Sequence, residues 1–400
     1  MTNMLSFKVN GQDQQLEIEP DEMLSDVLRV RLGLTGTKIA CNEAECGSCT
    51  VLLDDQPVLS CTLPALKAEG REVRTIESLN GEDALHPLQE AFIEHGAIQC
   101  GFCIPGQIMT ALALLERNPS PAESEIRYAL KDTLCRCGGY PSIVHAVQAA
   151  AESMRENKPV ARPVFATSGD YRHIGRPAVR PDARAKADGS AMFTDDFSFP
   201  GMLYARVLRA GIPHARVMSI KTSEAASLPG VHAVLTAADI PGEINHGLVT
   251  RDWPALIGIG KKARYVGDAL AIVAAESYKI ASAAIELIEV ELEPLPIVTS
   301  AVAADVPGAP LVHENGNLLD EIKVVKGDLE AGFSAADMVL EGTYETPTME
   351  HIFMEPECSI ARPLPDGRME IYVGSQHCTF KTQSRTSTRL KKESRKNILI

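Results

Sequence analysis

Four cysteines near the start of the chain have the clearest capacity for chemistry, and they are Cys41, Cys46, Cys49 and Cys61. Four residues separate the first two, two separate the next two, and eleven precede the last. This spacing is typical of four thiolates that hold a [2Fe–2S] centre. Gly47 lets backbone amides approach the sulfurs closely, and Ser48 adds a donor. Zinc is the main alternative, although its sites favour two CxxC-like pairs, and disulfides are a weaker alternative.

A second set of four cysteines follows within the first 140 residues, as Cys100-Gly-Phe-Cys103 and Cys135-Arg-Cys137. The first pair precedes a predicted helix, whose free N–H groups and dipole favour an anionic group. The second pair cannot share a helix face at its spacing, so a turn is predicted there, with Gly138 and Gly139 supplying the freedom. Taken alone this set fits zinc or iron, but beside the first set a second [2Fe–2S] centre is the better interpretation.

The first set is predicted to lie in a small sheet-plus-helix unit that ends near residue 80. The turn signal Asn10-Gly11 joins two alternating segments, and Pro20-Asp21 opens a helix that Gly33 ends. The predicted strands are residues 5–9, 16–18, 50–53, 58–61 and 73–76.

The second set is predicted to lie at one end of a small bundle of four short helices. Helical periodicity places these helices at residues 87–95, 104–117, 121–134 and 141–154. For the third helix, Ser120-Pro121-Ala122-Glu123 combines an N-cap, a first-turn proline and a capping glutamate.

The remaining chain changes character twice. Residues 155–185 are rich in proline and arginine, which predicts an extended linker. From residue 186 the pattern is mixed α/β, with a helix at 277–286 and a loop at 302–320. The strands predicted there are residues 203–208, 231–235, 269–275, 287–292, 338–344 and 369–373.

The composition favours a globular protein of several domains, because the chain has 400 residues with 45% hydrophobic and 23% charged side chains. A net charge of −14 argues against a nucleic-acid surface, and 5% aromatic residues offer no platform for stacking bases. No signal peptide and no membrane span is predicted. The expected location is therefore the cytoplasm, where cysteines bind metal more often than they form disulfides. Eight of the ten cysteines form the two sets, and Cys358 and Cys378 are expected to be buried thiols.

Together these motifs resemble the molybdenum hydroxylases, the family of xanthine dehydrogenase and aldehyde oxidoreductase. Both cysteine sets carry the resemblance, with Gln99 before Cys100 and Tyr140 after the second set. Later segments follow in the family's order, and the resemblance covers residues 5–376. The segments are His86-Pro-Leu-Gln89, Phe193-Thr-Asp-Asp196, Pro229-Gly-Val-His232, Tyr265-Val-Gly-Asp268 and His351 to Pro356.

The resemblance implies an α+β fold class with five successive regions. These are a β-grasp plant-type ferredoxin domain (1–80), a four-helix-bundle [2Fe–2S] domain (81–155), a linker (156–185), a hammerhead domain (186–300) and the start of a molybdopterin-binding domain (301–400). It implies two [2Fe–2S] clusters and, for the whole enzyme, molybdopterin. Electrons would leave an aldehyde or N-heterocycle at molybdenum and pass through the helical-domain cluster, then the plant-type cluster. Gln99 and Cys137 would lie against the pterin.

The resemblance also implies partners. These are a small-molecule substrate, an electron acceptor such as a flavin subunit, a ferredoxin or a flavodoxin, and a second copy of the chain in a homodimer. The family's glycine-rich cofactor loops and its catalytic glutamate lie beyond Ile400, so a truncated or frameshifted chain is expected and no catalytic residue is assigned. The alternative function is a non-catalytic [2Fe–2S] electron carrier, or a subunit without molybdenum.

Three histidines and one glutamate outside the cysteine sets are expected to have structural rather than functional roles. His214, His232 and His351 are expected at the surface or satisfied in the core, rather than as ligands. Glu355 could transfer protons, but a structural hydrogen bond is the favoured interpretation.

Overall fold

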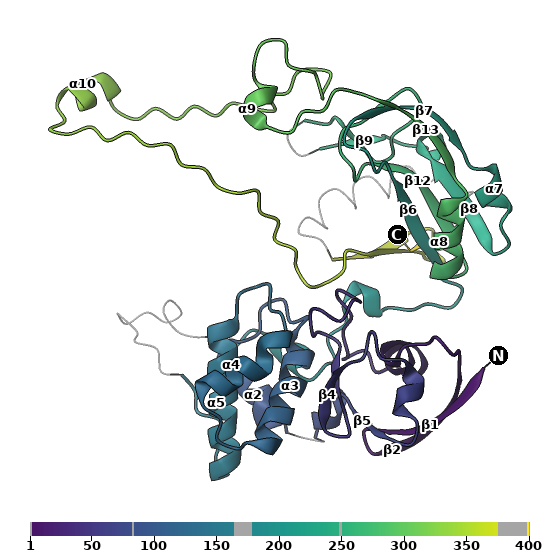
Figure 1. Ribbon diagram of the computed structural model, residues 1–400, viewed down its shortest axis with the longest axis vertical. Helices are drawn as coiled ribbons and strands as arrows, with labels where there is room; N and C mark the ends of the chain where they lie inside the picture. Colours follow the sequence, from purple (N-terminus) through teal and green to yellow (C-terminus); the bar gives the residue numbers. More distant parts are fainter. Residues whose placement is uncertain (1, 82–83, 164–177, 248–249, 375–397, 400) are drawn as a thin grey trace. The chain divides into compact units, whose positions relative to one another are not determined.

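The computed structural model describes residues 2–81, 84–163, 178–247, 250–374 and 398–399. The chain forms two compact units (Figure 1). The first unit comprises Met1–Phe197 and Met349–Pro356, and the second comprises Ser198–Thr348 and Glu357–Ile400. The basic segment near the end of the chain, residues 385–396, lies outside the described residues.

A five-stranded sheet forms the first part of the first unit, in the order β2-β1-β5-β3-β4. Its strands are β1 (Asn3–Val9), β2 (Gln12–Ile18), β3 (Thr50–Leu53), β4 (Gln56–Leu59) and β5 (Glu72–Arg74). Strand β5 runs parallel to β1, while β1 and β2 form the predicted hairpin around Asn10 and Gly11. Leu5, Phe7 and Val9 alternate into a buried core, as the sequence pattern predicted.

The helix that follows β2 is shorter than predicted. It consists of α1 (Leu24–Asp26) and the π-helical turn η1 (Val27–Arg31). It begins after Pro20 and Asp21 because Met23 forms a β-bridge with Pro64, so its backbone is extended rather than helical. Two 3₁₀ turns complete this part, η2 (Ala65–Ala68) and η3 (Ile76–Leu79).

The four predicted helices are confirmed as α2 (Pro87–Glu94), α3 (Ile104–Arg117), α4 (Glu123–Ala129) and α5 (Tyr140–Glu156), and they lie side by side in Figure 1. The start of α4 differs from the prediction. The carboxylate of Glu125, not Glu123, accepts the Ala122 amide at 2.7 Å, so the capping glutamate lies two residues later. The helix then gives way to a 3₁₀ turn, η4 (Leu130–Asp132), because Thr133 is extended and hydrogen-bonds to Gln107.

The end of the predicted linker is not extended. Residues Ala183–Ala187 form the short helix α6, and Thr194–Asp196 form the 3₁₀ turn η5. Ala183 and Ala187 are buried in the core of the helical bundle. The proline and arginine content of residues 155–185 concealed these small apolar positions. Residues 178–197 therefore pack as part of the first unit.

The second unit contains a six-stranded sheet in the order β15-β14-β16-β6-β12-β8 and a three-stranded sheet in the order β11-β7-β13. The strands of the larger sheet are β6 (Leu203–Arg209), β8 (Val231–Thr236), β12 (Ala269–Ala275), β14 (Ser359–Pro363), β15 (Met369–Val373) and β16 (Ile398–Leu399). The smaller sheet contains β7 (Ala215–Lys221), β11 (Lys262–Ala263) and β13 (Glu289–Pro294), and β9 (Asn245–His246) pairs with β10 (Trp253–Pro254).

The described helical elements of this unit are α7 (Ser223–Ser227), η6 (Ala237–Asp239), α8 (Tyr278–Glu286), α9 (Ala301–Ala304) and α10 (Leu329–Ser334). The prediction missed strands β7 and β14 and the two-residue strands β9, β10, β11 and β16. The predicted strand at 338–344 is wrong, because every residue in it is exposed and no described strand pairs with it. No helix in the described parts of the chain has the length and apolar character needed to cross a membrane.

Candidate metal centres

The first cysteine loop joins η1 to β3 and curls around its own sulfurs. Asn42, Ala44 and Gly47 have φ values of 55°, 61° and 72°, in the left-handed region. This curvature directs backbone amides inward, and the Glu43 amide lies 3.4 Å from Cys41 Sγ. Amide donors around a sulfur stabilise its thiolate, so the loop suits an anionic, metal-bound sulfur.

The four sulfurs of this set form two hydrogen-bonded pairs, Cys41 with Cys46 and Cys49 with Cys61. Burial raises the pKa of Cys49 to about 12. Burial also acts to raise the pKa of Cys41, but amide hydrogen bonds from Glu43, Glu45 and Cys46 outweigh it and lower that pKa. A buried thiol such as Cys49 becomes a thiolate readily only when a cation binds it, which fits a metal centre.

The second set likewise pairs Cys100 with Cys137 and Cys103 with Cys135. Cys103 is the N-cap of α3, and Cys135 accepts amide hydrogen bonds from Gly139, Cys137 and Gly138. The hydrogen bond from Cys103 and these amides lower the pKa of Cys135 to about 6, although burial opposes the shift. The same hydrogen bond, with burial, raises the pKa of Cys103 well above its usual range.

The structure thus groups the eight predicted cysteines as expected, four in the first set and four in the second. Two irons that each take two thiolates suit such paired sulfurs, so each set fits a [2Fe–2S] centre.

The two cysteine loops touch each other through their backbones. The Leu134 amide donates to the Cys46 carbonyl at 2.9 Å. At Gly106, in the first turn of α3, an added Cβ would lie 2.3 Å from the carbonyl oxygen of Gly47. The buried side chains of Gln107 and Thr133 hydrogen-bond to each other at 2.9 Å behind this contact. The loops that carry the two sets are therefore held in direct contact.

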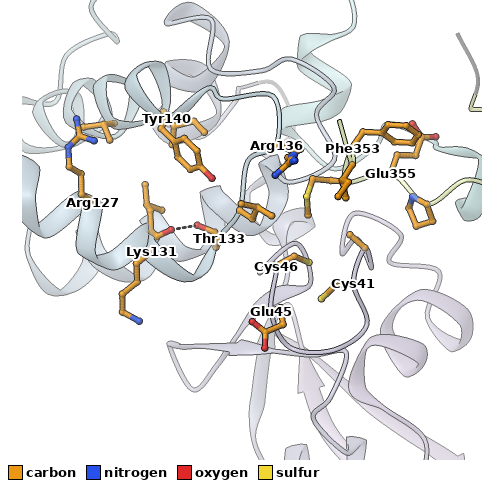
Figure 2. A pocket seen from close by; sticks show the side chains of 18 residues that line it. Cys41, Glu45, Cys46, Arg127, Lys131, Thr133, Arg136, Tyr140, Phe353 and Glu355 are labelled. Carbon is orange, nitrogen blue, oxygen red and sulfur yellow. Dashed lines mark hydrogen bonds between the residues drawn. The ribbon is translucent and has the colours of Figure 1, made fainter. Parts of the chain in front are cut away.

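A cavity of about 680 Å³ opens beside this contact (Figure 2). Its wall includes Cys41 and Cys46 of the first set, and Arg136 and Tyr140 from beside the second. Residues 352–356 close one side of it, although they are distant in sequence. Arg136 donates to the His351 backbone carbonyl, which ties this segment to the helical part.

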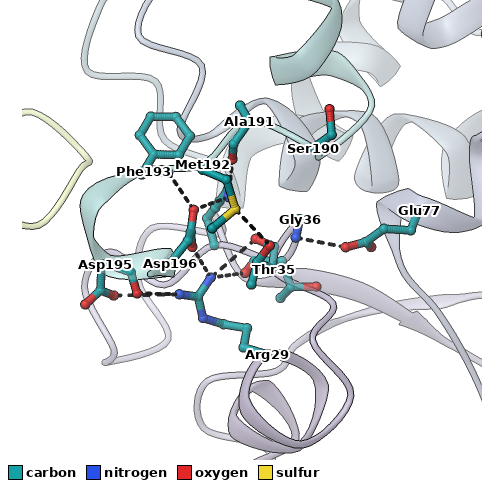
Figure 3. Close-up of polar contacts among 12 residues, drawn as sticks. Arg29, Thr35, Gly36, Glu77, Ser190, Ala191, Met192, Phe193, Asp195 and Asp196 are labelled. Carbon is teal, nitrogen blue, oxygen red and sulfur yellow. Dashed lines mark hydrogen bonds and ion pairs between the residues drawn. The ribbon is translucent and has the colours of Figure 1, made fainter. Parts of the chain in front are cut away.

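A buried ion cluster lies near the first loop (Figure 3). Lys38 Nζ lies 2.6 Å from one carboxylate oxygen of Asp196, and Arg29 lies 2.8 Å from the other. The ammonium also lies 4.9 Å from the ring centroid of Phe193, and burial lowers the pKa of Lys38. Phe193 in turn packs edge-on against Phe102, between Cys100 and Cys103, with ring centroids 5.0 Å apart. Residues 190–197 thereby cover both cysteine loops.

Gln99 and Cys137, predicted to contact a pterin, are both exposed on the first unit. Lys186 Nζ donates to the Gln99 carbonyl at 3.3 Å. Sequence reasoning missed Lys38 and Lys186, because neither is close in sequence to the groups it contacts. The Phe193-Thr-Asp-Asp196 motif was the available signal for the ion cluster, but it did not identify the partner of Asp196.

The isolated histidines differ in their surroundings. His351 is exposed, as expected, and His214 Nδ1 lies 2.6 Å from the Pro296 carbonyl oxygen. The buried Nε2 of His214 has no hydrogen-bond partner in the described part of the chain, so this histidine is only partly satisfied. His232 hydrogen-bonds to the exposed Glu276 at 3.2 Å. Burial raises the pKa of Glu355, whose carboxylate accepts a hydrogen bond from the Thr194 amide, as the structural interpretation predicted.

Comparison with known proteins follows the same division of the chain. Domain-family models match the 2Fe-2S iron-sulfur cluster binding domain at 7–79, the [2Fe-2S] binding domain at 75–148, the aldehyde oxidase and xanthine dehydrogenase a/b hammerhead domain at 188–296 and the molybdopterin cofactor-binding domain at 312–396. The nicotinate dehydrogenase small FeS subunit of Eubacterium barkeri is 42% identical over 148 residues, which are 37% of this chain and 94% of that protein. The chain belongs to the molybdenum hydroxylase family.

Two further relatives extend the match along the chain. The aldehyde oxidoreductase of Megalodesulfovibrio gigas is 36% identical over 382 residues, which cover 92% of this chain and 42% of that protein. A solved aldehyde oxidoreductase structure from Desulfovibrio gigas matches with a TM-score of 0.85 and 36% identity, covering 93% of this chain and 43% of that one. The chain thus spans less than half the length of these relatives.

These matches confirm the predicted α+β fold class and the family. They also show two [2Fe–2S]-binding domains and a match to a molybdopterin-binding domain in this chain.

Proposed function

We propose that this chain is the electron-transfer portion of a molybdenum hydroxylase that oxidises an aldehyde or an N-heterocycle. The observation that carries the proposal is the direct contact of two four-thiol loops, through the hydrogen bond from Leu134 to Cys46. When bound, a [2Fe–2S] group accepts and returns one electron at a time. Electron tunnelling falls steeply with distance, so loops in contact favour transfer between the two centres.

The residues of this chain hold, shield and tune the two centres. The eight proposed iron ligands are Cys41, Cys46, Cys49, Cys61, Cys100, Cys103, Cys135 and Cys137. We assign the contact with the pterin to Gln99 and Cys137, and their exposure supports this assignment. The second set then receives electrons and the first set delivers them to the acceptor.

The domain divisions follow from the same proposal, at residues 80, 155, 185 and 300, with residues 183–197 packed onto the iron–sulfur unit. The proposed partners are a small-molecule substrate, an electron acceptor (a flavin subunit, a ferredoxin or a flavodoxin) and a second copy of the chain. The proposed location is the cytoplasm. The names of the relatives, aldehyde oxidoreductase and nicotinate dehydrogenase, support the two substrate classes.

A non-catalytic electron carrier is the second candidate. The nicotinate dehydrogenase small FeS subunit favours it, because nearly all of that separate chain aligns with only 37% of this one. In that relative the corresponding portion is a subunit of its own. Both candidate functions require the eight cysteines as iron ligands, but only the enzyme requires molybdenum.

Metal analysis and EPR of the purified chain test the proposal. We expect about four iron and four sulfide per chain, and two distinct EPR signals after reduction with dithionite. Cys41→Ser removes one signal and Cys103→Ser removes the other. Bound zinc without sulfide, or one signal that Cys103→Ser leaves unchanged, contradicts the two-centre proposal. Molybdenum with pterin separates the enzyme from the carrier.

A further inference from the structure

The side chain of Lys186 lies across the loop that carries Cys100 and Cys103. Gly101, between them, has a φ of +92°, and a Cβ added there would lie 2.4 Å from Lys186 Cδ and 2.6 Å from Cγ. The stem of the lysine therefore occupies the space that a side chain at position 101 would fill. Its ammonium donates to the Gln99 carbonyl at 3.3 Å, just before the first cysteine of the loop.

Helix α6 holds this lysine in place. The helix is anchored in the bundle core through Ala183 and Ala187, and the Ala187 carbonyl accepts a hydrogen bond from Gln89. The Lys186 ammonium also lies 2.7 Å from a carboxylate oxygen of Asp182, and the side chain of Lys186 is only 11% exposed. A cation that is mostly buried and anchored at both ends keeps a fixed position.

The charges around this lysine do not cancel. Asp182 binds two cations, Lys186 and Arg180, so the three side chains carry one net positive charge. Arg180 interacts electrostatically with the second set. Its pKa is raised chiefly by its hydrogen bond to Asp182, and the sulfurs of Cys100 and Cys137 add to the effect. The excess charge therefore faces the cysteines of the second set.

We infer that Lys186 is a positioning residue of the second centre, which fixes the Cys100–Cys103 loop and raises the reduction potential of the cluster bound there. The inference rests on the proposed function, since it requires a [2Fe–2S] cluster on the second set. Reduction adds one electron and one negative charge to the cluster. A cation held nearby in partly buried surroundings stabilises that reduced form more than the oxidised form.

The cluster on the first set serves as an internal control for the effect of Lys186 on the reduction potential. Near its loop, the cations Lys38 and Arg29 face the carboxylates of Asp196 and Asp195, so those four charges cancel. Replacing Lys186 should therefore shift the potential of one cluster and leave the other unchanged. A general loss of folding would change both.

The test is a redox titration of the whole purified chain, reduced stepwise with dithionite and followed by EPR. Dithionite supplies one electron to each cluster, and the two signals report their midpoint potentials separately. In K186M we expect the signal of the second centre to shift to lower potential while the first stays in place. K186R keeps the charge and should return the second signal close to its original potential.

Two further variants sharpen the result. D182N removes the opposing carboxylate and should shift the second potential upward, opposite to K186M. K158M removes a cation that is exposed beside Glu156 and should shift neither signal. Loss of the second signal in K186M with its retention in K186R also supports the inference, because it shows the loop-fixing role.

Other outcomes overturn the inference without touching the proposed function. These are an unchanged second potential in K186M with full iron content, or an equal shift of both signals. Loss of the second signal in K186R as well as in K186M also counts against it. The proposed function fails by a different result, in which the unsubstituted chain itself binds only one cluster. Iron and sulfide content of that chain, measured first, separates the two failures.

Discussion

The two sets of cysteines differ in how the surrounding protein encloses them. In the first set three of the four cysteines are buried, and the Glu43 amide of the loop donates to Cys41 Sγ. In the second set Cys137 is exposed, and the cover over the Cys100–Cys103 loop comes from α6, far along the chain. The first set therefore keeps three of its four sulfurs buried, whereas the second leaves Cys137 at the surface.

Removal of one cysteine from each set gives the largest expected effect. Cys49 and Cys103 are 2% and 3% exposed, and each pairs with another cysteine of its own set. We expect Cys49→Ser to remove the first centre and Cys103→Ser the second, each with a loss of about half the iron. Iron analysis and EPR measure this directly. Cys358 lies outside both sets, so Cys358→Ser serves as the control and should retain all the iron. If either loop substitution removed both centres, the loops would not bind independently.

The buried ion cluster should give the next largest effect. The side chains of Lys38 and Asp196 are each 1% exposed, and Asp196 also pairs with Arg29. D196N leaves the buried Lys38 without its carboxylate, which costs about 3–5 kcal/mol, and we expect this loss in urea unfolding. K38M should cost less, because Asp196 keeps Arg29 as a partner. The double variant should lose less than the sum of the two, because the charges interact. K158M, an exposed cation, should cost less than about 1 kcal/mol. Additive losses would show that the two charges do not stabilise each other.

The contact between the loops is tested at Gly106. Replacement of a helical glycine with alanine normally stabilises a helix by about 1 kcal/mol. Here the added Cβ would lie 2.3 Å from the Gly47 carbonyl oxygen, and backbone atoms cannot move aside easily. We therefore expect G106A to destabilise the first unit by about 1–3 kcal/mol. Gly332, also helical, has no atoms within 4 Å of an added Cβ, so G332A should leave the unfolding of this unit unchanged. A gain in stability in G106A would rule out the tight contact.

The sequence predicted correctly those features that depend on residues close together in the chain. The spacing of the eight cysteines predicted two sets of four, and alternation in residues 5–9 predicted the first strand. It failed where partners lie far apart along the chain. Lys38 and Asp196 are separated by 158 positions, and Lys186 and Gln99 by 87, so no local pattern joins them. The segment 338–344 alternates like a strand, yet pairs with no described strand, since pairing depends on neighbours that periodicity does not reveal.

The smallest expected effect concerns the ion pair between the two parts of the first unit. Arg74 on β5 binds the Glu116 carboxylate of α3 through two hydrogen bonds, at 2.9 and 2.6 Å, and also lies 2.8 Å from Asp55. Both side chains of the pair are partly solvent-exposed, at 24% and 36%, so solvent screens much of the attraction.

We expect E116Q to lower the free energy of unfolding of the first unit by about 0.5 kcal/mol, with the loss shrinking as salt is added. Glu123→Gln, which breaks an exposed pair within α4, provides the matched control. A loss in the control as large as that in E116Q would mean that Arg74 adds nothing by bridging β5 and α3. A larger loss in E116Q would show that the sheet and the bundle are linked by this pair as well as by their cysteine loops, and so unfold together.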